Sequence, residues 1–191
     1  MMIRNPLPLL SLCLTFLVGL PCLSAKSLKK DPTKPLFASK VVTAQTPGQS
    51  IEVSADLKGA KELHLYVSDA GNGYGCDWAD WVDPRLVDAS GKETKLTSMK
   101  WKYASAGWGA VNLNKNAGGA PMKVAGKAAH GIGCHANSLI SYELPANHKF
   151  VRFVAKGALD DGGATQGACG NQSSVQFFVY SQKPKVMSGI S

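Results

Sequence analysis

Hydrophobic residues alternate with polar ones in many short stretches of the chain, which is typical of β-strands with one buried face. In residues 63–67, for example, Leu63, Leu65 and Val67 share one face of an extended strand. Clusters of Gly, Asn, Asp and Ser separate these stretches at intervals of about 8–12 residues, as turns do in all-β proteins. The strands that we expect are 51–55, 63–67, 81–88, 94–97, 107–113, 131–135, 139–144, 149–156 and 175–180.

The strand pattern predicts one all-β domain over residues 47–183, with the jelly-roll form of a β-sandwich. No stretch shows the period of an amphipathic helix, and residues 160–171 are polar and rich in Gly. The length of 191 residues and the 45% share of hydrophobic residues suffice for one globular core. We find no internal repeat and no second domain.

The two ends of the chain differ from this domain. Residues 1–25 begin with an early Arg, continue with an apolar stretch and end in small residues, which is the pattern of a secretory signal peptide. The apolar stretch is short for a membrane span. Residues 26–46 are rich in Lys, Pro and Thr and predict a tether, and residues 184–191 predict a C-terminal tail. We therefore expect a secreted protein, extracellular or periplasmic, whose ordered part begins near Ser50.

The net charge of +8 lies mainly in the first 40 residues. Residues 26–40 contain five Lys and one Asp, and residues 1–25 contain one Arg and no acid, so the rest of the chain holds 15 basic and 12 acidic residues, or +3. The Lys-rich segment has no interleaved aromatic residues, so it does not predict a nucleic-acid site. We expect neither a nucleic-acid partner nor a membrane span.

Three of the five cysteines lie beyond the predicted signal peptide: Cys76, Cys134 and Cys169. Export allows one disulfide among them and leaves one thiol over. Their spacing does not predict a zinc site.

The chain contains none of the GxSxG, HExxH, P-loop or dinucleotide-binding motifs that mark common catalytic centres. Polar and aromatic residues gather instead in three segments at the ends of the predicted strands. This pattern favours recognition over catalysis.

The first of these segments, residues 76–85, contains Trp78, Asp80 and Trp81. Aromatic rings stack on the apolar face of a sugar, and nearby carboxylates bind its hydroxyl groups. A tryptophan in such a strand is more often a core residue, which applies above all to Trp81, whereas Trp78 fits either role. The segment therefore predicts one wall of a sugar site.

The second segment, residues 131–138, contains His135 and Asn137, which share one face of an extended strand. They fit either the recognition of hydroxyl groups or a structural turn. Trp108, between two glycines, is either a packing residue or a ring at the surface. In the third segment, Asp160 and Asp161 lie in a Gly-rich loop. Paired acids bind Ca²⁺ together with backbone carbonyls, although they are also common in exposed turns.

Taken in order along the chain, these segments resemble the NPCBM family of carbohydrate-binding modules. The resemblance covers residues 63–180, nearly the whole predicted domain. The residues that carry it are Ala79-Asp80-Trp81 with Asp83-Pro84-Arg85, Gly107-Trp108-Gly109, Gly131-Ile132-Gly133 with His135-Ala136-Asn137-Ser138, Ser141-Tyr142-Glu143-Leu144-Pro145, Leu159-Asp160-Asp161 and Ser174-Val175-Gln176-Phe177.

The resemblance implies a galactose-binding-like β-sandwich, a galactose-type glycan as the ligand and a structural Ca²⁺ held by Asp160 and Asp161. It also implies a disulfide between Cys76 and Cys169, which leaves Cys134 free, buried and inert. The residues that we expect to bind the sugar are Trp78 or Trp81, Asp80, His135 and Asn137.

Several features depart from the family pattern. Trp78 stands where His is common, and Cys134 stands where a small residue such as Thr is common. Modules of the family usually accompany an exported enzyme domain, whereas here the module makes up most of the chain. These departures leave open an envelope protein with a structural or protein-binding role and a degenerate sugar site.

A glycoside hydrolase is the other alternative, and it requires two carboxylates about 5–10 Å apart across a cleft. The acids that the sequence offers for this role are Asp77, Asp80, Asp83, Asp160 and Asp161. Because several of them fit turns and a small sandwich offers a shallow surface, we expect a non-catalytic binding module.

Overall fold

The computed structural model describes residues 34–185 of the chain. The predicted signal peptide over residues 1–25 and most of the predicted tail over 184–191 lie outside the described residues. Within residues 34–185, no helix is long and apolar enough to cross a membrane.

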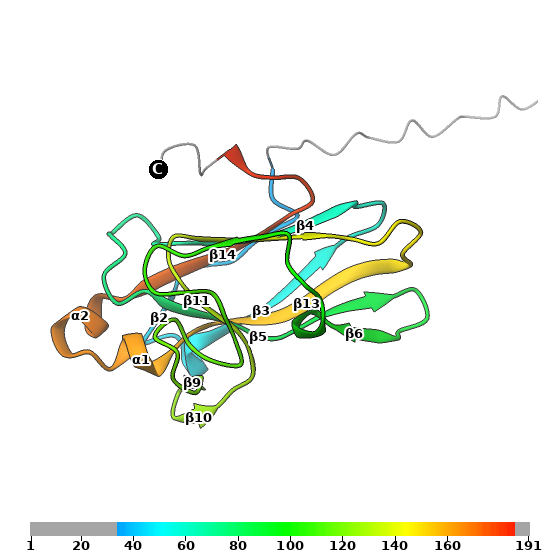
Figure 1. Ribbon diagram of the computed structural model, residues 1–191. Coiled ribbons are helices and arrows are strands. Elements are labelled where there is room, and N and C mark those ends of the chain that lie inside the picture. Colours follow the sequence, from blue (N-terminus) through cyan, green and yellow to red (C-terminus); the bar gives the residue numbers. More distant parts are fainter. Residues whose placement is uncertain (1–33, 186–191) are drawn as a thin grey trace, which may run out of the picture.

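Two six-stranded antiparallel sheets pack face to face and form a β-sandwich (Figure 1). This confirms the predicted all-β fold. The strands of the first sheet are β1 (Phe37–Ala38), β2 (Val42–Thr43), β4 (Glu62–Ser68), β7 (Tyr103–Ser105), β12 (Ser138–Glu143) and β14 (Ser174–Tyr180). Their order is β1-β14-β4-β12-β7, and β2 also pairs with β14.

The second sheet has the order β3-β13-β5-β11-β8, with β6 paired to β5. Its strands are β3 (Ser50–Asp56), β5 (Trp78–Asp88), β6 (Glu93–Lys95), β8 (Asn112–Leu113), β11 (Gly131–His135) and β13 (Phe150–Leu159). The remaining elements are the hairpin of β9 (Lys123–Val124) and β10 (Lys127–Ala128), the helices α1 (Asp161–Ala164) and α2 (Gly167–Gln172), and the short 3₁₀ turns Pro47–Gln49 and Leu96–Ser98.

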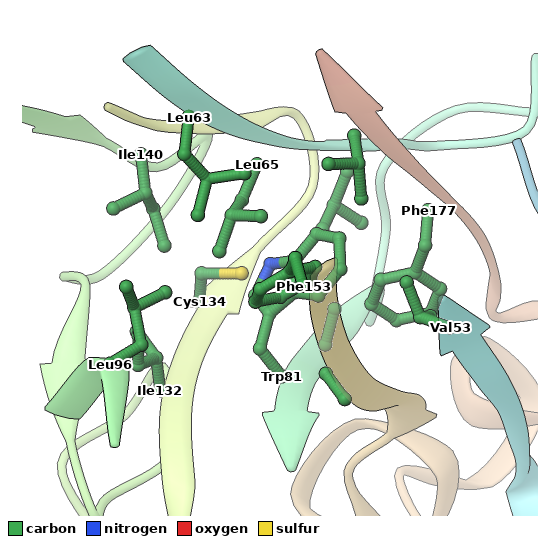
Figure 2. Packing of buried hydrophobic residues seen from close by; sticks show 14 of the residues in the cluster. Val53, Leu63, Leu65, Trp81, Leu96, Ile132, Cys134, Ile140, Phe153 and Phe177 are labelled. Carbon is green, nitrogen blue, oxygen red and sulfur yellow. The ribbon is translucent and has the colours of Figure 1, made fainter. Parts of the chain in front are cut away.

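The core fills the space between the two sheets, as the alternating pattern predicts. Leu63, Leu65 and Val67 of β4 are fully buried. They face the second sheet, where the ring of Trp81 meets Phe153 edge-on (Figure 2). The apolar surface buried between the two sheets provides most of the hydrophobic stabilisation of the fold.

The prediction of a tether over residues 26–46 is wrong for its described part. Val42 is fully buried, and Phe37 lies opposite Val179 in the pairing of β1 with β14. The Ser39 hydroxyl accepts a hydrogen bond from the Phe177 N–H at 2.9 Å. The segment is short and has no regular alternation, but its few apolar residues cover one edge of the first sheet.

Two further segments differ from the predicted strands. Of residues 107–113, only Asn112–Leu113 form a strand, so Trp108 lies in a loop. The polar stretch 160–171 forms α1 and α2 in place of a plain loop, and the Asp160 carboxylate begins α1 by accepting a hydrogen bond from the Gly162 N–H. Such short helices have no amphipathic period in the sequence because they span barely one turn.

The sandwich has two ends, which the register of β4 and β12 defines. Val67 lies opposite Ser138 at one end, and Glu62 lies opposite Glu143 at the other. We call the first the aromatic end; it carries loop 69–77, α1, α2 and the β9–β10 hairpin, at the left of Figure 1. The second is the turn end, where the β3–β4 and β12–β13 turns lie at the right of the same figure.

Candidate functional site

Four aromatic side chains gather at the aromatic end, and we call them the aromatic cluster: Tyr74, Trp78, Trp108 and His135. The Trp78 and Trp108 rings stack with centroids 5.3 Å apart, and Trp108 also lies 5.8 Å from the His135 ring. Tyr74 meets His135 edge-on, with ring centroids 6.0 Å apart. The cluster is thus a continuous run of rings from loop 69–77, β5, the loop between β7 and β8, and β11.

The cluster combines exposed and buried rings. Tyr74 is 56% exposed and Trp108 is 52% exposed, whereas Trp78 is half-buried and His135 is 3% exposed. Large exposed rings beside a buried polar ring have the chemistry to match a ligand with both apolar and polar faces.

Strand pairing explains why Trp78 and His135 meet. They lie directly opposite each other in the antiparallel pairing of β5 with β11. Residues opposite each other in such a pair point to the same face, with Cβ atoms about 5 Å apart. Asp80 is on that same face because it follows Trp78 by two residues.

The His135 imidazole is held as a neutral acceptor. Its Nδ1–H donates to the Ala136 carbonyl at 2.6 Å, which leaves Nε2 without a proton and without a hydrogen-bond partner among residues 34–185. Burial lowers the pKa of His135, so the ring is uncharged at neutral pH. Its Nε2 atom is therefore able to accept a hydrogen bond from a ligand hydroxyl.

Glycines hold the Trp78 ring in place. A Cβ atom on Gly118 would lie 2.5 Å from Trp78 Cη2, and one on Gly163 would lie 2.9 Å from Trp78 Cβ. Side chains at these positions would push the ring away, so the loop around Gly118 and helix α1 fit closely around it. The ring is fixed before any ligand arrives.

Asn137 supports the loop that carries Tyr74. Its Oδ1 atom accepts hydrogen bonds from the Tyr66 hydroxyl at 3.2 Å and from the Asp69 N–H at 3.1 Å. Because both acceptor positions of the amide oxygen are occupied, Asn137 positions residues 69–77. A direct sugar contact by Asn137 stays a prediction.

The prediction of sugar contact is wrong for Trp81 and Asp80. Trp81 is fully buried in the core and packs edge-on against Phe177 at 5.0 Å. Asp80 is also fully buried, beneath the segment that contains Asn116 and beside Asp160. Trp81 and Asp80 have no exposed surface at all, so neither side chain can contact a glycan.

Asp80 and Asp160 form a buried pair of carboxyl groups. Burial raises the pKa of Asp80 well above its usual range, and the negative charge of Asp160 raises it further. If Asp80 were ionised, its two oxygens would have no hydrogen-bond donor among the described residues. Protonated Asp80 instead donates a hydrogen bond to the Asp160 carboxylate, which removes the charge repulsion and gives one of the two Asp80 oxygens a partner.

Asp160 and Asp161 do not fit the predicted calcium site. The Asp160 oxygens accept hydrogen bonds from the Gly162 N–H, the Asn116 amide and the Lys123 N–H at 2.8–3.0 Å. Asp161 accepts one from the Gly126 N–H at 2.8 Å. Within the described part of the chain, no three His, Cys, Asp or Glu side chains are placed to hold a metal. Because N–H donors already occupy the Asp160 oxygens, Asp160 fits a structural role, and calcium binding by the pair stays a prediction.

The disulfide between Cys76 and Cys169 is present, and it links loop 69–77 to α2. Cys134 is free and fully buried. Burial raises the pKa of its thiol to about 12, so it stays protonated and unreactive, as predicted.

The acids that a hydrolase would need are mostly inaccessible. Asp77, Asp80 and Asp160 are fully buried, and the exposed Asp83 binds the Arg85 guanidinium at 2.8 Å. Burial also raises the pKa of Asp77 to about 7. These carboxyl groups do not line an open cleft.

Tyr74 was not among the predicted site residues, and the sequence did not decide whether Trp108 is a packing residue or a ring at the surface. Both rings lie in Gly-rich loops, where a large apolar side chain has no strand or helix to pack against. An aromatic residue flanked by glycines is therefore a signal of a surface contact.

A family model described as the NPCBM/NEW2 domain matches residues 29–87 and 92–189. No curated protein and no solved structure matches the chain. The matched segments include every strand described above, except for the last residue of β5, and cover most of the chain. The chain therefore belongs to the NPCBM/NEW2 domain family of carbohydrate-binding modules.

Proposed function

We propose that the protein is a secreted, non-catalytic carbohydrate-binding module that recognises galactose-type or related glycans with its aromatic cluster. The observation that carries the proposal is the pair of exposed rings, Tyr74 and Trp108, that both contact the neutral His135 imidazole. Membership of a carbohydrate-binding family supports the same ligand class.

In this proposal the ligand is bound by two kinds of contact. The apolar face of the sugar ring stacks on Trp108, which is supported from behind by Trp78. A hydroxyl group of the sugar donates to His135 Nε2. One sugar offers few atoms, so we expect a modest affinity.

Two observations support secretion and the lack of catalysis. The Cys76–Cys169 disulfide is typical of an oxidising compartment outside the cytosol. The burial of Asp77, Asp80 and Asp160 removes the acids that glycoside hydrolysis would use.

Calorimetric titration with galactose tests the proposal, using Trp108→Ala and a matched control, Tyr103→Ala. Tyr103 is also an exposed ring, but it lies on β7, away from the aromatic cluster. We expect Trp108→Ala to weaken binding by at least about tenfold and Tyr103→Ala by no more than about twofold.

Equal losses in the two variants would contradict the proposal, as would the absence of galactose binding by the wild-type protein at millimolar concentration. In that case, the alternative of a protein-binding module with a degenerate sugar site would gain support.

A further inference from the structure

A groove of about 1310 Å³ opens at the turn end, opposite the aromatic cluster. The β3–β4 turn, the β12–β13 turn and the residues that follow β14 line it. Pockets for small molecules measure about 300–1,000 Å³, so this groove is large enough for a segment of a polymer.

The two turns that line the groove are bonded to each other. The His148 Nε2–H donates to the Ala60 carbonyl at 2.7 Å, and the Leu144 N–H donates to the Lys61 carbonyl at 2.9 Å. The Phe150 N–H donates to His148 Nδ1 at 3.1 Å, which fixes the imidazole ring. The groove is thus formed in advance, which reduces the entropy lost on binding.

Three lysines on the groove, Lys58, Lys61 and Lys149, are exposed and form no ion pair with a described residue. The acid nearest to Lys58 along the chain, Asp56, accepts a hydrogen bond from the Lys58 N–H. Three positive charges within one groove attract an anionic ligand over about 8–10 Å at physiological salt.

The two acids on the groove are already engaged. Glu143 pairs with Lys102 at 3.3 Å. Glu62 lies 4.0 Å from the same Lys102 amine and accepts a hydrogen bond from His64 Nε2 at 3.1 Å. The lysines of the groove therefore keep an excess of positive charge.

The groove also has an apolar, ring-bearing surface. The His148 ring stacks on the half-buried Phe150 ring at 5.3 Å, and Leu144 is buried beside them. A sugar ring places its apolar face on such a surface, while acidic groups spaced along a polysaccharide reach separate lysines.

We propose that the turn end is a second binding site, which takes an acidic polysaccharide whose carboxylate or sulfate groups pair with Lys58, Lys61 and Lys149. The site is separate from the aromatic cluster and does not depend on the proposed galactose site. The chain then holds an uncharged glycan at one end and an anionic glycan at the other.

Calorimetric titration of the full chain tests this site, with polygalacturonate as the carboxylate probe, heparin as the sulfate probe and dextran as the uncharged control. The test variant is Lys58→Gln/Lys61→Gln/Lys149→Gln. We expect it to weaken binding of at least one anionic probe by about tenfold at low salt, and dextran not to bind. We expect wild-type binding to weaken between about 20 mM and about 300 mM salt.

The matched control is Lys40→Gln/Lys100→Gln/Lys127→Gln, which removes three exposed lysines that do not line the groove. Both variants keep the Lys residues at positions 26–34, so any diffuse attraction by that segment is the same in each. The control should bind within about twofold of wild type.

Equal losses in the two triple variants would overturn the proposal, because diffuse charge would then explain the binding. It would also fail if neither polyanion bound at millimolar concentration, or if poly-glutamate bound more tightly than both glycans through the same lysines, which would indicate a protein partner. Trp108→Ala should leave polyanion binding unchanged, so the two sites can fail independently.

Discussion

At the residue scale, the alternation of side chains along β5 decides which of them point into the core. Trp81 and Ala79 point into the core, whereas Trp78 and Asp80 point to the outer face of the second sheet. Trp78 and Trp81 are three residues apart, so they cannot share a face of one strand. The prediction of a sugar site that contains Trp78 or Trp81 treated the two positions as interchangeable, although the period of two in β-strands already argued against it.

This alternation does not distinguish Trp78 from Asp80, so the exposure of Trp78 and the burial of Asp80 could not be predicted from the strand pattern. Both side chains face outward, but the chain around Asn116 covers Asp80 and leaves Trp78 half-exposed. The path of such a loop depends on long-range contacts and has no periodic signal.

Asp77 makes the stability of the fold depend on pH. Its Oδ1 atom accepts a hydrogen bond from the Ser174 N–H at 2.8 Å, but Oδ2 is buried without a partner among the described residues, and burial raises the pKa to about 7. Between about pH 4 and pH 7 the folded state therefore binds more protons at this carboxyl than the unfolded state does. The free energy of unfolding contributed by Asp77 falls as the pH rises through this range.

We expect Asp77→Asn to remove that contribution, so that its free energy of unfolding falls less steeply than that of the wild type between pH 4 and pH 7. Urea unfolding of both proteins across this range measures the difference. Parallel curves would show that the Asp77 carboxyl does not titrate as its burial implies.

At the element scale, the aromatic end depends on loops that are fastened at several points. The disulfide joins loop 69–77 to α2, and Asp160 accepts hydrogen bonds from the chain near Asn116 and near Lys123. The family resemblance implied the disulfide pairing correctly. The hydrogen bonds of Asp160 were not visible in the sequence, because acids in a Gly-rich loop fit a metal site equally well.

Removal of the disulfide in Cys76→Ser/Cys169→Ser should lower the free energy of unfolding by about 2–4 kcal/mol, since the bridge closes a long loop. It should also weaken galactose binding, because the segment that carries Tyr74 loses its covalent anchor. Chemical denaturation and calorimetric titration measure the two effects. Reduced wild-type protein should behave like the double variant, and a double variant as stable as the oxidised wild type would contradict the role of the bridge.

At the scale of the whole molecule, the aromatic cluster and the lysine-lined groove lie at opposite ends of the sandwich, so the length of the strands separates them. The alternating pattern predicted most of the long strands, because strands such as β4 and β13 have one face in a continuous core. It did not predict β1 and β2, whose two-residue lengths are too short for any period. The groove at the turn end escaped prediction because its residues come from turns that are distant in sequence.

We expect the fold to be stable without calcium, because N–H donors occupy the oxygens of Asp160. We expect the melting temperature to change by less than about 2 °C between excess EDTA and millimolar Ca²⁺, because a ligand that does not bind the folded state does not stabilise it. Differential scanning calorimetry measures this shift. A Ca²⁺-dependent rise of more than about 5 °C would show that a calcium site exists elsewhere or displaces these N–H donors.

The pairing of β1 and β2 with β14 has a practical consequence. A protein shortened to begin at Ser50 would lack both strands and leave one side of β14 with unpaired N–H and C=O groups. Open strand edges of this kind join the edges of other copies, so such a fragment would tend to self-associate and precipitate. The short segment before β3 therefore protects the molecule against aggregation.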